Sequence, residues 1–169
     1  MTRRTIATIV AYAVAPLCAS NLSFAETPAA VAAPDEIALL TAQAQGAQIY
    51  ECKAGADGKP SWSFREPIAS LFENGQTIGR HFRGPTWELV DSSLVTGKVI
   101  GDAPGATPQD IPWLKLEVVT RFGTGKLTGA TTIQRINTKG GVLQGDCPGV
   151  GAFFSAPYAT DYVFLKKAN

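Results

Sequence analysis

The sequence of 169 residues contains only one histidine and three cysteines. Such a small set excludes most zinc sites and most catalytic triads, because these need several ligands or partners of those types. Charged residues are also scarce, at 17 %, and the formal net charge is +1. No overall excess of positive charge therefore favours nucleic-acid or anionic-membrane binding. We expect no cofactor, no metal site and no nucleic-acid partner.

Long apolar runs are missing after the N-terminus, where no segment approaches the roughly 20 residues that span a membrane. Residues 1–25 have the features of a secretory signal peptide. Arg3 and Arg4 precede an apolar run that ends at Leu17, and a small residue, Ala25, stands at the expected cleavage point. We predict cleavage there and export to the periplasm or the cell exterior, with no integral membrane segment left. An uncleaved N-terminal anchor is the alternative.

The cysteines predict a disulfide. Cys18 would leave with the signal peptide, and Leu17 before it is too large for lipoprotein processing. The two that remain, Cys52 and Cys147, would form one bridge in an oxidising compartment. The bridge would close the long loop between residues 52 and 147. In the chain-entropy model, closing a loop of roughly 100 residues stabilises the folded state by about 4–5 kcal/mol. Free thiols or metal ligands are the alternative, but only His81 could join them.

Glycine and proline are abundant, with 17 and 11 residues, and they separate short alternating apolar runs. This pattern is typical of strands and turns, not of a helical bundle. The sequence therefore predicts an all-β fold, a single antiparallel β-sandwich or small β-barrel of about eight strands with one disulfide. The expected strands are 47–52, 62–65, 77–83, 86–90, 93–100, 113–122, 129–137 and 159–165.

Three segments follow from these features. Residues 1–25 are the signal peptide, 26–36 a flexible leader rich in proline and alanine, and 37–169 a single β-rich domain. At the start of the domain, residues 37–45 could form a short helix or turn capped by Asp35.

The densest group of chemically active residues contains His81, Arg83, Trp87, Glu88 and Asp91. If the intervening Gly-Pro turn folds two strands back to back, His81 and Glu88 could meet on one side. A histidine paired with a carboxylate could act as an acid–base pair or form one edge of a metal site. The alternative is a buried structural histidine, with Trp87 in the core.

Four arginines fall in separate expected strands and could form an anion-binding patch: Arg80, Arg83, Arg121 and Arg135. Ordinary solvent-facing strand positions are the alternative.

Several segments occur together in an order that is similar to one family: residues 46–52, 79–88 and 134–141, then Cys147 and residues 158–164. With these, the chain resembles the secreted bacterial and fungal family catalogued as domain of unknown function 3455, over about residues 37–165. The resemblance implies an exported β-rich domain. It transfers no catalytic residue, because the family carries no established activity.

These observations favour a non-enzymatic exported domain that binds a small molecule, a glycan or an envelope protein. The candidate binding residues are His81, Arg83, Trp87, Glu88 and Asp91. One alternative is a hydrolase- or isomerase-type enzyme that uses His81 with Glu88 or Asp91. Another is a purely structural envelope protein, which would have no concave pocket near His81.

Overall fold

The computed structural model describes residues 27–168 except residue 57. Eight strands follow one another in these residues, and no α-helix lies among them, so the predicted all-β fold is confirmed. A single 3-10 turn, η1 (Lys126–Gly129), precedes β7. The strands are β1 (Glu36–Ala54), β2 (Pro60–Glu73), β3 (Gln76–Phe82), β4 (Thr86–Leu89), β5 (Leu94–Ala103), β6 (Trp113–Phe122), β7 (Thr132–Gly140) and β8 (Phe153–Lys167).

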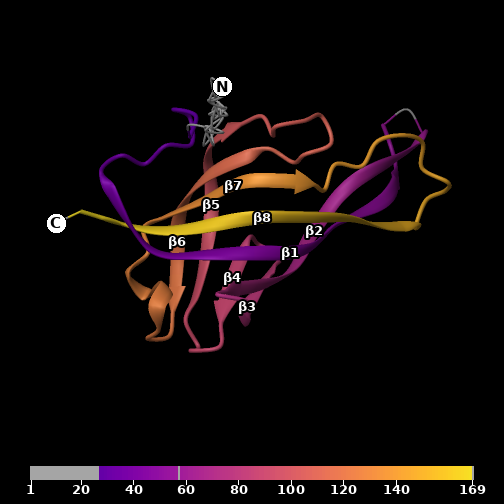
Figure 1. The fold of residues 1–169 in the computed structure, drawn as a ribbon. Coiled ribbons are helices and arrows are strands. Elements are labelled where there is room, and N and C mark those ends of the chain that lie inside the picture. The colour runs from indigo at the N-terminus through magenta and orange to yellow at the C-terminus, as the bar shows by residue number, and fades with distance from the viewer. Residues whose placement is uncertain (1–26, 57, 169) are drawn as a thin grey trace, which may run out of the picture.

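The eight strands form one closed antiparallel barrel (Figure 1). Each strand pairs with the next along the chain, and β1 pairs with β8 to close the ring. Of the two architectures that the sequence left open, the structure therefore has the barrel. No helix among the described residues has the length and apolarity that crossing a membrane requires.

The first half of β1 corrects one prediction. Residues 37–45 were expected to form a helix or turn, but they belong to a strand of 19 residues. Within it Leu40, Ala42 and Ala44 are buried, while the residues between them are exposed. This two-residue alternation is that of a strand with one face toward a core. Pairing with β8, joined by β2 from Gln43 onward, outweighs the helix propensity of the alanines.

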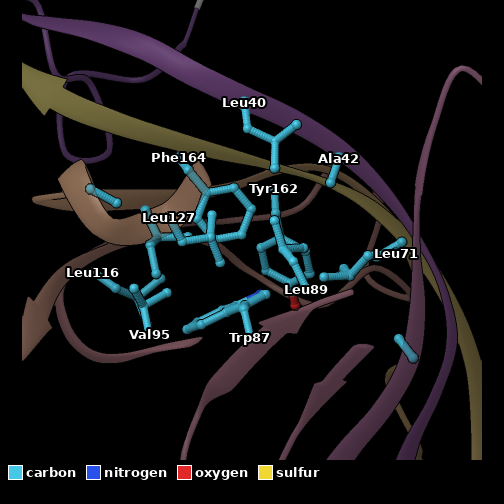
Figure 2. Packing of buried hydrophobic residues seen from close by; sticks show 14 of the residues in the cluster. Leu40, Ala42, Leu71, Trp87, Leu89, Val95, Leu116, Leu127, Tyr162 and Phe164 are labelled. Carbon is cyan, nitrogen blue, oxygen red and sulfur yellow. The ribbon is translucent and has the colours of Figure 1, made fainter. Parts of the chain in front are cut away.

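Large side chains fill one part of the barrel interior. Trp87, Tyr162 and Phe164 lie together, with ring centroids 5.2 Å apart for Trp87 and Tyr162 and 6.2 Å apart for Trp87 and Phe164. Leu116 and Leu127, the second carried by η1, pack beside them (Figure 2). The aromatic group therefore forms the centre of the hydrophobic core.

The segment before β1 contacts the barrel at Val31. A flexible leader was expected over residues 26–36, of which Glu36 already belongs to β1. Val31 is fully buried and packs with Ala103 and Trp113. Its carbonyl accepts a hydrogen bond of 2.6 Å from Nε2 of Gln134 on β7. Val31 therefore attaches this segment to the barrel through an apolar contact, which its proline- and alanine-rich composition does not predict. The predicted signal peptide, residues 1–25, lies outside the described residues.

The predicted disulfide joins Cys52 and Cys147, whose Cα atoms are 5.8 Å apart. It links the end of β1 to the loop between β7 and β8. In this region β1, β2 and β8 continue beyond the other strands as a three-stranded arm (Figure 1). The bridge therefore fixes the arm and the loop beside it.

Removing the disulfide should destabilise the domain. We expect the double variant C52S/C147S to lose about 2–4 kcal/mol of unfolding free energy, because the unfolded chain gains the freedom of a long open loop. Urea unfolding of the oxidised protein, with and without reductant, measures this loss. Reductant should leave the double variant unchanged. Equal stability of wild type and variant would contradict the structural role of the bridge.

Docking of the leader predicts a difference between two substitutions. Val31→Asp should lower the unfolding free energy by about 2 kcal/mol or more, because it places a carboxylate in an apolar contact. Ala29→Asp, at an exposed position of the same segment, is the matched control and should be nearly neutral. Thermal unfolding and limited proteolysis of the segment report the effect. Equal behaviour of the two variants would show that the leader does not dock.

Candidate binding site

A cavity of about 350 Å³ enters the barrel. Every one of the eight strands contributes at least one lining residue. Buried residues such as His81 and Trp87 lie in its depth and exposed ones such as Phe64 and Val99 at its rim, so the cavity reaches the barrel interior and opens to solvent. Its wall is mainly apolar and aromatic, with three arginines. The lining residues are Gln48, Tyr50, Phe64, Arg65, Pro67, His81, Arg83, Gly84, Pro85, Trp87, Val99, Ile111, Pro112, Leu114, Leu116, Arg135 and Tyr162.

The hydrophobic core forms one wall of the cavity. Trp87, Leu116 and Tyr162 belong to both the core cluster and the cavity lining. The indole of Trp87 fits there because Gly97 on β5 has no side chain. A Cβ at that position would lie 3.2 Å from Leu116 and 3.3 Å from the indole. The large rings are thus held rigidly on one side, as a binding surface requires.

His81 points into the barrel from β3 and is 3 % exposed. Its ring stacks on Trp87, with centroids 4.4 Å apart and an angle of 14° between the planes. Nδ1 lies 2.9 Å from the carbonyl oxygen of Thr86. Because a carbonyl only accepts hydrogen bonds, this contact assigns the proton to Nδ1 and leaves Nε2 as an acceptor.

The pKa of His81 is lowered to about 4, mainly by burial and to a smaller extent by the positive charge of Arg135. The hydrogen bond to the Thr86 carbonyl opposes this fall but does not cancel it. His81 is therefore neutral at physiological pH. A group with so low a pKa is a weak base, and it presents a flat, uncharged surface beside Trp87.

Glu88 does not join His81, and the prediction that they meet is wrong. The β3–β4 register sets His81 opposite Trp87 and Arg80 opposite Glu88. Because side chains alternate between the two faces of a strand, Glu88 leaves the barrel while Trp87 enters it. On the outside, Glu88 forms an ion pair with Arg80 at 2.6 Å.

Asp91 has a structural position in the turn between β4 and β5. Its carboxylate accepts hydrogen bonds from the backbone N–H and hydroxyl of Ser93, at 2.9 and 2.6 Å, and from the backbone N–H of Lys126, at 2.8 Å. Burial raises its pKa, but these hydrogen bonds outweigh that effect and hold the pKa below its usual value. Asp91 thus ties the turn to η1.

Of the five predicted site residues, the structure places His81, Arg83 and Trp87 around the cavity and leaves Glu88 and Asp91 out of its lining. Of the four arginines considered for an anion-binding patch, Arg83 and Arg135 line it. Neither predicted histidine–carboxylate pair shares this site. Ligand binding by these residues stays a prediction.

The sequence interpretation missed Gln48 and Tyr50, which also line the cavity. The signal was present, because they continue the inward alternation of Ala42 and Ala44 along β1. Polar side chains on the inward face of a strand indicate a hollow interior. Because residues 37–45 were expected to form a helix or turn, the inward face of β1 was not followed from Ala42 to Tyr50.

A closed eight-stranded barrel with an internal cavity defines the class of the protein. The chain belongs to the family described as "Protein of unknown function (DUF3455)", whose model matches residues 32–166. The resemblance seen in the sequence is thus confirmed. No curated protein and no solved structure matches the chain. Across residues 27–168, leaving out residue 57, no group of three or more His, Cys, Asp or Glu residues could hold a metal ion.

Protonation of His81 should destabilise the protein in acid. In the unfolded chain its pKa is about 6.5, so the unfolded state takes up the proton first as the pH falls. The unfolding free energy should fall from about pH 6.5 downward, with a loss of about 3 kcal/mol by about pH 4. Urea unfolding of wild type at several pH values measures this loss.

The control is His81→Asn, whose amide can still donate to the Thr86 carbonyl but does not titrate. Subtracting its pH profile removes the contribution of the carboxylates. If the two profiles are parallel between about pH 4 and pH 6.5, His81 is not buried as a neutral group.

Proposed function

We propose that this protein is a non-enzymatic binding protein that holds a small molecule in the barrel cavity. The observation that carries the proposal is the cavity itself, which all eight strands line. An eight-stranded barrel has an interior wide enough for side chains or for one small ligand. Here side chains fill one part of that interior and leave the cavity in another.

The size and wall of the cavity favour a small molecule over a glycan or an envelope protein. Its volume of about 350 Å³ falls within the range of small-molecule sites. Such sites are mostly apolar, with a few polar groups that orient the ligand, and the same mixture lines this cavity. A pocket beside His81 also speaks against a purely structural role, because that role predicts none.

The surroundings of His81 favour binding over catalysis. The enzymatic alternative needs His81 beside Glu88 or Asp91, but neither carboxylate lines the cavity. Glu88 pairs with Arg80, and Asp91 accepts hydrogen bonds from Ser93 and Lys126. The low pKa of His81 makes it a poor general base near neutral pH.

We place the protein in the periplasm or outside the cell. The disulfide fits an oxidising compartment. The signal-peptide features of residues 1–25 supply the means of export.

The test uses 2-naphthol, an uncharged probe with a flat apolar body. Three tryptophans give three indole N–H resonances, and only Trp87 lines the cavity. We expect 2-naphthol at up to about 1 mM to shift the Trp87 resonance and leave that of Trp113 in place.

A matched pair of variants locates the binding. Val99→Trp places a large ring in the cavity lining and should abolish binding. Val119→Trp changes an equally exposed valine of β6 that does not line the cavity, and it should leave binding intact. No shift at Trp87, or binding that Val99→Trp does not affect, would contradict the proposed function.

A further inference from the structure

The charged side chains of the cavity all have the same sign. Arg65, Arg83 and Arg135 line it, His81 is neutral, and no aspartate or glutamate is among the lining residues. The whole chain has a formal net charge of only +1, so this concentration is local. Low-dielectric walls around charges of one sign strengthen the field on a ligand of opposite charge.

Two of the three arginines have acidic partners outside the cavity lining. Arg65 contacts Glu51 at 3.5 Å and Glu66 at 3.1 Å, and Arg83 contacts Glu66 at 3.4 Å. Their charge is therefore partly compensated.

Arg135 is different, because no carboxylate of the described residues lies within ion-pair distance of it. Its Nε and Nη2 donate to the carbonyl oxygen of Pro112, at 3.1 and 2.8 Å. This contact fixes the guanidinium but does not neutralise it, because a carbonyl oxygen carries no net charge; the Tyr162 hydroxyl is a further polar neighbour of the guanidinium in the cavity wall. Arg135 thus supplies an oriented, uncompensated positive charge to the cavity.

Buried donors accompany this charge. Nε2 of Gln48, Nε1 of Trp87 and the hydroxyl of Tyr162 have no hydrogen-bond partner among the described residues. Their side chains are 3 %, 1 % and 1 % exposed, and all three residues line the cavity. Figure 2 shows the indole nitrogen and the tyrosine oxygen at the same side of the cluster. Since buried donors need acceptors, the ligand should carry acceptor oxygens.

The rest of the wall requires an apolar ligand body. His81 and Trp87 form a stacked pair, and Tyr162 stands against both rings at 4.9 and 5.2 Å. Leu114 and Val99 add aliphatic surface from the neighbouring strands. Aromatic faces of this kind favour flat ligands.

We infer that the cavity selects a small organic carboxylate with a flat apolar body, and that Arg135 binds the carboxylate group. This inference rests on the proposed function and adds the chemistry of the ligand. An arginine fork and a carboxylate form paired, charge-assisted hydrogen bonds, which amides and alcohols cannot reproduce. The apolar body lies against the His81–Trp87 pair. The buried donors replace the hydrogen bonds from water that the carboxylate loses on binding.

Three probes with the same ring system test the charge preference: 2-naphthoate, 2-naphthamide and 2-naphthylmethylammonium. Calorimetry and the Trp87 indole resonance report binding to the wild-type protein. We expect 2-naphthoate to bind roughly tenfold or more tighter than 2-naphthamide, and the ammonium probe to bind weakest. The preference for the anion should shrink as salt is added.

The variant Arg135→Gln should remove the preference for the carboxylate. We expect it to lower the affinity for 2-naphthoate and to leave the affinity for 2-naphthamide unchanged. Arg121→Gln is the matched control. Arg121 also donates to a backbone carbonyl, that of Ala130 at 2.8 Å, but it does not line the cavity. This control should retain the full preference.

The outcomes distinguish failure of the anion inference from failure of the proposed function. Equal binding of carboxylate and amide by the wild type would overturn the anion inference and leave the proposed function standing. A preference that survives Arg135→Gln would overturn the role of Arg135. If Arg135→Gln does not fold, the wild-type ratio still decides anion selection, and Arg135→Lys, which keeps the charge but loses the fork, tests the residue. No binding of any probe at about 1 mM would overturn the proposed function as well.

Discussion

Closure of the sheet by β1 is the constraint on which the rest of the structure depends. This strand pairs with β2 along one edge and with β8 along the other, so the ring has no open edge and its interior has a fixed width. β1 approaches its neighbour closely at Gly46, where an added Cβ would lie 2.7 Å from that of Ala69. The small residues Ala42 and Ala44 precede it on the inward face and leave room for large rings from the other strands.

The fixed interior is divided between a packed core and an open cavity. On one side Trp87, Phe164 and Leu127 pack together in the hydrophobic core (Figure 2). On the other the inward positions carry polar or charged groups, Gln48 and Arg135 among them, and the space between them stays open. One group of rings serves both parts, so the rigidity of the core extends directly to the wall of the cavity. A loosened core would therefore change the site as well as the stability.

Much of the fold could be predicted from the sequence, because alternating apolar and polar residues indicate strands, and glycine and proline indicate turns. The all-β class, the strand number and the Cys52–Cys147 bridge followed from those local signals. The first half of β1 did not, since its alanines suit a helix and become a strand only through pairing with β8, far away in the sequence. Of the candidate site residues, His81, Arg83 and Trp87 line one cavity, but the place of Glu88 depends on the register across a short turn. A shift of one residue in that register exchanges the inner and outer faces.

The buried donors support the proposal that the cavity is a binding site and not an imperfectly filled core. Five buried side-chain donors have no partner among the described residues, and three of them belong to residues that line this cavity; a donor left unpaired costs about 1–3 kcal/mol. Leucine at the position of Gln48 would avoid the cost, and Leu40, nearer the start of the same strand, packs into the core in this way. The disulfide contributes stabilisation of comparable magnitude at the arm next to the cavity. In this barrel, closure of the sheet and the disulfide offset the free-energy cost of the polar groups around the cavity. Stability given up in this way for recognition is what we expect of a binding site.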